Sequence, residues 1–455
     1  MVKRNRVAPA ALMALLALGL VTQAQAAPKE KRIVYSLGGE AETLDPTKNN
    51  YSRSSFVLQN LFRGLYKMGA DGSTTPAIAS GYTLDAAGTT YVFTLKDSKW
   101  SDGKSLTAAD FEYSWKRVLN PETASRGAFY LFYLKNGKAY NDGKAKAEEV
   151  GVKAKDAKTL VVTLENPTPY FIDLLCVTAY YPVRKDVVEN PEPWTKSAKT
   201  YVSNGPFLLA DIKPKEEYVL KKNPNYIDAA KVQLDTLEML FIEAPETELA
   251  AYMAGSIDVA DQLSAEALKS YKDKPDFHAI SRIGERYLDI NVDKAPFGDA
   301  RVRKAFSMAI NREQIVKNIL QLPDKPAYGI VPFGIPYATK PGKDYRDVVG
   351  NDLVKEDIGA AQKLLSDAGF PGGKGLPAEV SIVTWESKVY SDEIAKGNFM
   401  ICRDGWTGDY PDPMTMLELF DTHGNLDDTH WSNATYDKLI AENKVITDKQ
   451  KRMHH

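Results

Sequence analysis

The chain has 455 residues, in which 58 Lys and Arg nearly balance 60 Asp and Glu for a net charge of −2. Such a mixed, near-neutral balance gives no electrostatic footprint for nucleic acid or for an anionic membrane surface. The length predicts two or three domains.

The N-terminus has the three parts of a secretory signal peptide. Met1–Arg6 is basic, Val7–Val21 is apolar, and Ala24 and Ala26 are the small residues of a cleavage site. The apolar run is too short to anchor the chain in a bilayer. We therefore expect cleavage after Ala26 and export of a water-soluble chain that begins at Ala27. No cysteine near this point indicates a lipid anchor.

Strand and helix patterns are mixed along the rest of the sequence. A strand predicted at 33–37 is followed by a turn at 42–46 and by leucines at helical spacing between 58 and 65. Alternating apolar residues predict two further strands, at 91–95 and 160–164. The pattern favours a mixed α/β protein.

Two helix starts can be located from their capping residues. Thr107 and Asp110 have the spacing of a capping box, with Asp in place of the usual Glu, ahead of an amphipathic helix. Asp299 precedes a second helix, whose apolar residues share one face and are interpreted as core: Val302, Ala305, Phe306, Ala309 and Ile310.

A search for catalytic and metal-binding motifs finds none. There is no His-Glu-x-x-His, Gly-x-Ser-x-Gly or Cys-x-x-Cys segment, so a secreted hydrolase is disfavoured. His423 and His430 lie among aspartates, where a weak metal site is conceivable but a solvated loop is the simpler interpretation. Cys176 and Cys402 could form one disulfide or remain two buried thiols. We expect no enzyme activity, no cofactor and no metal.

Segment 403–413 carries the densest set of candidate binding residues. Gly405 allows a sharp turn or a close approach of the backbone to a ligand. Trp406 and Tyr410 offer flat apolar walls with polar tips. Asp409, if partly buried, needs a cationic partner, and a bound ammonium group would serve. The segment is expected to be irregular, and taken alone its residues favour a tight surface turn over a binding site.

Several segments, in order, closely resemble the family 5 extracellular solute-binding proteins, the oligopeptide- and dipeptide-binding components of ABC importers. The signature Trp-Ser-Asp-Gly-Lys-Ser-Leu-Thr-Ala-Ala-Asp-Phe at 100–111 is among the matches. The other matching segments are 39–46, 61–65, 203–207, 223–226, 255–259, 296–306, 309–312 and 405–413. The resemblance covers nearly all of the chain after the predicted signal peptide.

The resemblance implies ligand-binding roles for six residues: Arg403, Gly405, Trp406, Asp409, Tyr410 and Tyr130. Asp409 would hold the α-amino group of a peptide through a charge-assisted hydrogen bond. Arg403 matches a family arginine that can face the peptide carboxylate. Tyr130 aligns with a tyrosine of the binding cleft, although Tyr133 is close in register and a core aromatic is an equally good interpretation.

The resemblance also implies a two-lobed periplasmic-binding-protein fold of type II-like α/β architecture, with an additional small α+β domain. The expected parts are a signal peptide at 1–26, lobe I at 27–62 and 180–285, the small domain at 63–179, and lobe II at 286–455.

The C-terminal lobe is expected to be incomplete. Residues 377–383 resemble the first strand of that lobe, but the segment matching 387–390 follows at once and leaves no room for a βαβ crossover of about 30 residues. The sequence also stops before the helix and strands with which family members return to the first lobe. We expect these gaps to weaken the second lobe.

The function implied is that of a monomeric periplasmic protein. It would capture short peptides and deliver them to an inner-membrane ABC permease. The alternative is a truncated, non-transporting homologue or receptor that binds peptides weakly or not at all.

Overall fold

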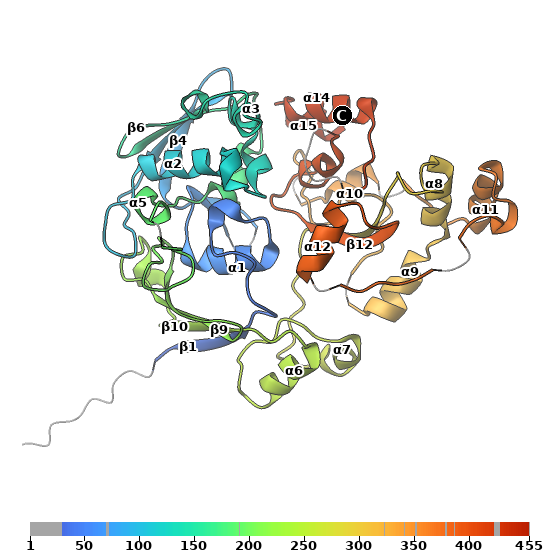
Figure 1. The fold of residues 1–455 in the computed structure, drawn as a ribbon, viewed down its shortest axis with the longest axis horizontal. Coiled ribbons are helices and arrows are strands. Elements are labelled where there is room, and N and C mark those ends of the chain that lie inside the picture. Colours follow the sequence, from blue (N-terminus) through green and yellow to red (C-terminus); the bar gives the residue numbers. More distant parts are fainter. Residues whose placement is uncertain are drawn as a thin grey trace, which may run out of the picture.

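The computed structural model describes residues 30–69, 72–190, 192–322, 324–340, 342–350, 353–377, 380–385, 387–422 and 428–454. The predicted signal peptide and His423 lie outside these residues. The chain forms two halves that lie side by side, and its last helices return to the side of the N-terminal half (Figure 1). Within the described ranges, no helix is long and apolar enough to cross a membrane.

A four-stranded sheet in the N-terminal half joins segments that are far apart in sequence. Its order is β1-β10-β9-β8, with β1 parallel to β10 and the other pairs antiparallel. The strands are β1 (Arg32–Ser36), β8 (Phe207–Lys213), β9 (Glu217–Lys222) and β10 (Thr236–Leu240). The strand expected at 33–37 is therefore confirmed, shifted by one residue. The helices of this part are α1 (Ser52–Leu61), α5 (Lys185–Val188), α6 (Pro245–Met253) and α7 (Ala265–Tyr271).

A second, antiparallel sheet has the order β4-β5-β7-β6. Its strands are β4 (Ala79–Leu84), β5 (Thr90–Leu95), β6 (Val152–Asp156) and β7 (Thr159–Thr163), with β2 (Tyr66–Met68) and β3 (Thr74–Pro76) paired beside it. The helices here are α2 (Ala108–Leu119), α3 (Gly137–Asn141) and α4 (Phe171–Leu174). The predicted capping box of α2 is present, since the Thr107 N–H donates to Asp110 Oδ2 at 2.8 Å.

One continuous hydrophobic core serves both sheets. It contains Phe93 and Leu160 of the second sheet and Leu220 and Met239 of the first, all fully buried. The two parts expected as lobe I and the small domain therefore share their interior, although the exact boundaries between them stay a prediction. The leucines expected in one helix are split, because α1 ends at Leu61.

The second half is built around a two-stranded antiparallel ribbon of β11 (Gly284–Ile290) and β12 (Ile401–Thr407). Around it lie α8 (Ala300–Ala309), α9 (Arg312–Gln314), α10 (Tyr345–Val349), α11 (Ile358–Asp367), α12 (Ser387–Ala395), α13 (Met414–Leu417), α14 (Ala434–Lys444) and α15 (Lys449–His454). Asp299 caps α8 as predicted, accepting a hydrogen bond from the Arg301 N–H. On the expected apolar face, Ala305 is buried but Ala309 is exposed.

Two local predictions are wrong. Residues 380–385 form no strand, because none of the described strands pairs with them, and the side chains of Val380 and Ile382 are 87% and 90% exposed. Segment 403–413 is not irregular throughout, since β12 continues to Thr407. The two cysteines are buried free thiols rather than a disulfide.

Candidate ligand-binding site

Asp409 connects the two halves of the molecule. It lies in the loop 408–413 between β12 and α13, where its backbone N–H donates to Thr415 Oγ1 at 3.0 Å. Its side chain accepts a hydrogen bond from Tyr130, whose hydroxyl lies 2.6 Å from Asp409 Oδ2. Tyr130 belongs to the half that contains the second sheet and is itself 4% exposed. The structure thus brings together the two residues proposed from opposite sides of a cleft.

The environment of Asp409 disfavours its negative charge. Burial raises the pKa of the carboxyl to about 7, the bond from Tyr130 lowers it, and the nearby Glu418 raises it further. Among the groups that the structure describes, no Lys or Arg side chain acts on this pKa. Asp409 is therefore a partly buried acceptor with a hydroxyl partner but without a cation, and a ligand ammonium would provide the missing charge.

A tyrosine cluster next to Asp409 is organised by Glu418. This carboxylate accepts hydrogen bonds from the Tyr133 hydroxyl and, at 2.6 Å, from the Tyr410 hydroxyl. The Tyr410 ring stacks on Tyr170 with centroids 5.2 Å apart. Tyr410 is 1% exposed, so in this arrangement it packs between protein groups rather than facing an open space. Tyr133, the neighbour in register of Tyr130, binds Glu418 and not Asp409.

The alternation of β12 separates the remaining predicted residues. Trp406 pairs with Glu285 across the ribbon, whereas Arg403 pairs with Leu288. Residues three apart on a strand point to opposite faces, so Trp406 and Arg403 do not share a face. Arg403 is exposed, and Trp406 is partly buried beside Glu285, whose carboxyl pKa is raised to about 7 by burial. The structure does not bring Arg403 to the Trp406 side.

Gly405 fits the ribbon for a steric reason. A Cβ at this position would lie 2.8 Å from the Glu285 carbonyl oxygen. The absence of a side chain therefore allows the two strands to approach each other, and this packing role accounts for the residue without reference to a ligand.

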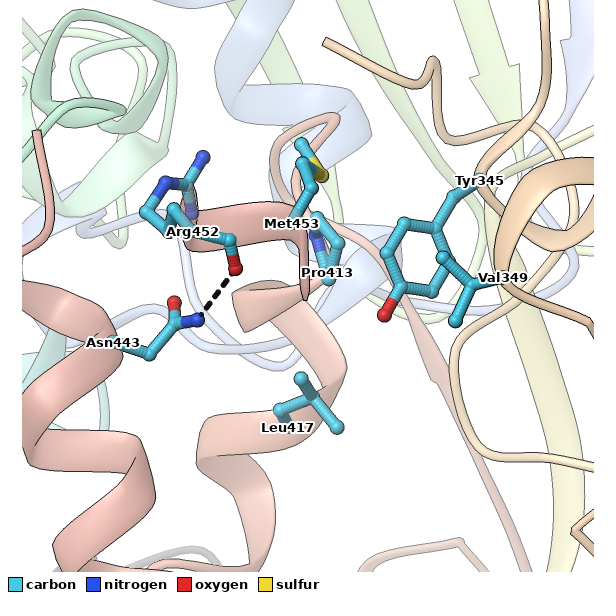
Figure 2. A pocket seen from close by; sticks show the side chains of 7 residues that line it. All are labelled: Tyr345, Val349, Pro413, Leu417, Asn443, Arg452 and Met453. Carbon is cyan, nitrogen blue, oxygen red and sulfur yellow. Dashed lines mark hydrogen bonds between the residues drawn. The ribbon is translucent and has the colours of Figure 1, made fainter. Parts of the chain in front are cut away.

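A small cavity lies on the other side of α13 from Asp409. Its volume is about 260 Å³, and it is lined by Tyr345, Val349, Pro413, Leu417, Asn443, Arg452 and Met453 (Figure 2). Pro413 and Leu417 are one helical turn apart and face the cavity, whereas Thr415, which binds Asp409, lies on a different face of the helix. The cavity is thus separate from the Asp409–Tyr130 contact.

Residues that the sequence did not single out complete the surroundings of Asp409. Arg452 donates from Nη1 to Asp412 Oδ1 at 2.8 Å and from Nη2 to Asp412 Oδ2, and both side chains are buried. A pairing across 40 positions leaves no local pattern in the sequence. Glu418 has a clearer signal, because a Glu within a mostly apolar stretch after a proline needs polar partners when it is buried.

Comparison with known proteins places this geometry in a family. Residues 73–379 match the sequence model of the bacterial extracellular solute-binding proteins, family 5 Middle. The oligopeptide-binding protein OppA of Bacillus subtilis strain 168 is 34% identical over 445 residues, an alignment that covers 91% of this chain and 82% of the relative.

Solved structures are similar over nearly the whole chain. OppA of Haemophilus influenzae in complex with the peptide RPPGFSPFR has a TM-score of 0.84 at 28% identity, covering 94% of this chain and 89% of that one. For the Escherichia coli murein tripeptide binding protein MppA, one structure gives 0.84 at 30% identity with coverages of 94% and 89%. The unliganded open form of MppA gives only 0.67 at 29% identity with coverages of 94% and 88%.

The two halves of this chain are therefore arranged more like those of the peptide complex than like those of the open form. Family match, relatives and fold agree: the chain belongs to the bacterial extracellular solute-binding proteins, family 5.

Proposed function

We propose that this protein is the peptide-binding component of an ABC importer. It captures short peptides in the periplasm and delivers them to an inner-membrane permease, acting as a monomer that binds its ligand without transforming it. The names of the similar proteins, which bind oligopeptides and a murein tripeptide, support this substrate class. The predicted signal peptide supports export, with Ala27 as the first residue of the mature chain.

The observation that carries the proposal is the state of Asp409. Its carboxylate is partly buried, receives one hydroxyl donor from the opposite half, and has no cationic partner among the described residues. A peptide α-ammonium that enters beside Tyr130 would form a charge-assisted hydrogen bond to Asp409 and at the same time contact both halves. Binding of the amino group would in this way favour the closed arrangement.

Calorimetry with short peptides tests the proposal. Asp409→Asn keeps the shape and the acceptor for Tyr130 but removes the charge, and it should weaken binding by about 2–5 kcal/mol. N-acetylation of the peptide should cause a similar loss for the parent protein and little further loss for the variant. Asp211→Asn, in an exposed position of β8, is the matched charge control and should bind like the parent. Equal affinity of parent and Asp409→Asn for free-amine peptides would rule out this role.

The mature terminus is tested separately. The intact mass of protein recovered from the periplasm should correspond to a chain that starts at Ala27. A mass that includes Met1 would contradict the predicted cleavage.

A further inference from the structure

Arg452 in α15 makes buried contacts with both halves of the molecule. Its guanidinium forms a two-pronged hydrogen-bonded ion pair with Asp412, and its side chain is only 6% exposed. The same guanidinium lies over the ring of Tyr170, 5.4 Å from the ring centre. Asp412 belongs to the loop that carries Asp409, and Tyr170 belongs to the half that supplies Tyr130. One side chain therefore fastens the loop and connects it to the opposite half.

A short chain of hydrogen bonds leads from Arg452 to Asp409. Asp412 Oδ1, which binds Arg452, also accepts from the Met414 N–H at 3.0 Å, and the Asp412 carbonyl accepts from the Thr415 N–H at 3.1 Å. These bonds fix the start of α13. Thr415 Oγ1 then accepts from the Asp409 N–H at 3.0 Å. The backbone of Asp409 is held by groups whose own position depends on Asp412.

The ring contact acts on the same loop from the other side. Tyr170 stacks on Tyr410, the residue directly after Asp409, with an angle of 7° between the rings. Tyr410 is part of the loop 408–413, so its stacking on Tyr170 connects the loop to the opposite half, as the contact between Arg452 and Tyr170 also does. Separation of the halves would remove Tyr170 from both Arg452 and Tyr410 but would leave the Arg452–Asp412 pair intact.

We propose that Arg452 is a positioning residue for the amino-group anchor. It touches no ligand itself, but holds the loop 408–413 in the shape that presents the Asp409 carboxylate to Tyr130, and its contact with Tyr170 reinforces that shape when the halves close. The affinity part of this inference rests on the proposed peptide binding, whereas the loop geometry can be tested without any peptide.

The test compares three variants with the parent protein. Arg452→Met keeps an unbranched apolar side chain but removes the guanidinium and its charge, which leaves Asp412 buried without a cation. The double variant Asp412→Asn/Arg452→Met leaves no unpaired charge at this position. It should therefore fold even if the single variant Arg452→Met does not, and the comparison can still be made. Arg117→Met is the matched control, because Arg117 forms a similar two-pronged and largely buried pair with Asp45, and both of these residues belong to the N-terminal half rather than to the loop 408–413.

Hydrogen exchange of the unliganded proteins is the first measurement. Both Arg452 variants should exchange the amides of Asp409, Met414 and Thr415 at least tenfold faster, and Arg117→Met should leave these amides unchanged. Unchanged protection of these amides in the folded double variant would overturn the inference.

Peptide affinity is the second measurement. The Arg452 variants should bind a free-amine tripeptide at least tenfold more weakly, and the affinity ratio between free and N-acetylated peptide should fall towards one. A uniform loss for both peptides, or an equal loss in Arg117→Met, would assign Arg452 a merely structural role. If the parent binds no peptide, the proposed function fails, but hydrogen exchange still decides the role of Arg452.

Discussion

Peptide binding should be linked to the protonation of Asp409. The carboxyl has a pKa of about 7 in the unliganded protein, because burial disfavours its charge. An ammonium group in contact would lower this pKa in the complex. Below pH 7 the peptide must therefore displace a proton from Asp409 before it can form the ion pair.

The size of this effect follows from the fraction of ionised carboxylate. With a pKa of about 7, roughly half of Asp409 is ionised at pH 7 but only about 1% at pH 5. The affinity should fall roughly 50-fold over this interval, about 2.3 kcal/mol. The α-amino group of a free peptide has a pKa of about 7.7–8.0, so the peptide stays charged and does not cause the loss.

Calorimetry at pH 5 and pH 7, in buffers that differ in ionisation enthalpy, measures both the affinity and the protons released. We expect about half a proton released at pH 7, approaching one at pH 5. Asp409→Asn should bind weakly at both pH values and release none. A flat affinity between pH 5 and 7, or a slope that persists in Asp409→Asn, would refute the reasoning.

Three further predictions concern stability, peptide binding and local structure. The folded pKa of Asp409, about 7, exceeds its unfolded value of 3.8, so the unliganded protein loses stability as the pH rises through this window. Asp409→Asn should consequently raise the free energy of unfolding at pH 8 by at most about 4 kcal/mol, which a higher unfolding temperature would show, and it should have little effect at pH 4. An unchanged melting curve at pH 8 would contradict this. Tyr130→Phe removes a hydrogen bond that stabilises the ionised carboxylate, so the pKa of Asp409 should rise further and peptide binding at pH 7 should weaken by at most about 1.5–3 kcal/mol in calorimetry. Equal affinity would contradict this. Ile382→Ser should change stability in urea by less than about 0.5 kcal/mol, because the side chain is 90% exposed, and a large loss would indicate a strand that pairs after all.

Local elements could be predicted from the sequence where their determinants are close together. Thr107 and Asp110 are three residues apart, and the helix start they predicted is present. The alternation in 91–95 and 160–164 also predicted the right strands, because both lie over the shared core. The resemblance of 377–383 to a strand of the family gave a wrong prediction for 380–385, because a strand requires a hydrogen-bonded neighbour and none of the described strands pairs with this segment.

The candidate site could be predicted only in part. The resemblance indicated Asp409 and Tyr130, and these residues meet across 279 positions. Interpreting 403–413 as irregular concealed that Arg403 and Trp406 lie on opposite faces of a strand, which alternation would have indicated. The Arg452–Asp412 pair joins elements whose proximity depends on the whole fold, so no spacing rule points to it.

The pairing of β1 with β10 has a consequence for the order of events during synthesis and export. These strands are separated by about 200 positions, yet they lie next to each other in parallel. Closing so long a loop is entropically unfavourable and slow, so β1 has no partner until more than half of the chain is available. The N-terminal strand directly follows the predicted signal peptide. The chain would therefore remain unfolded near its leader for long enough to be threaded through a secretion channel, and the first sheet would form only after β10 has emerged on the far side.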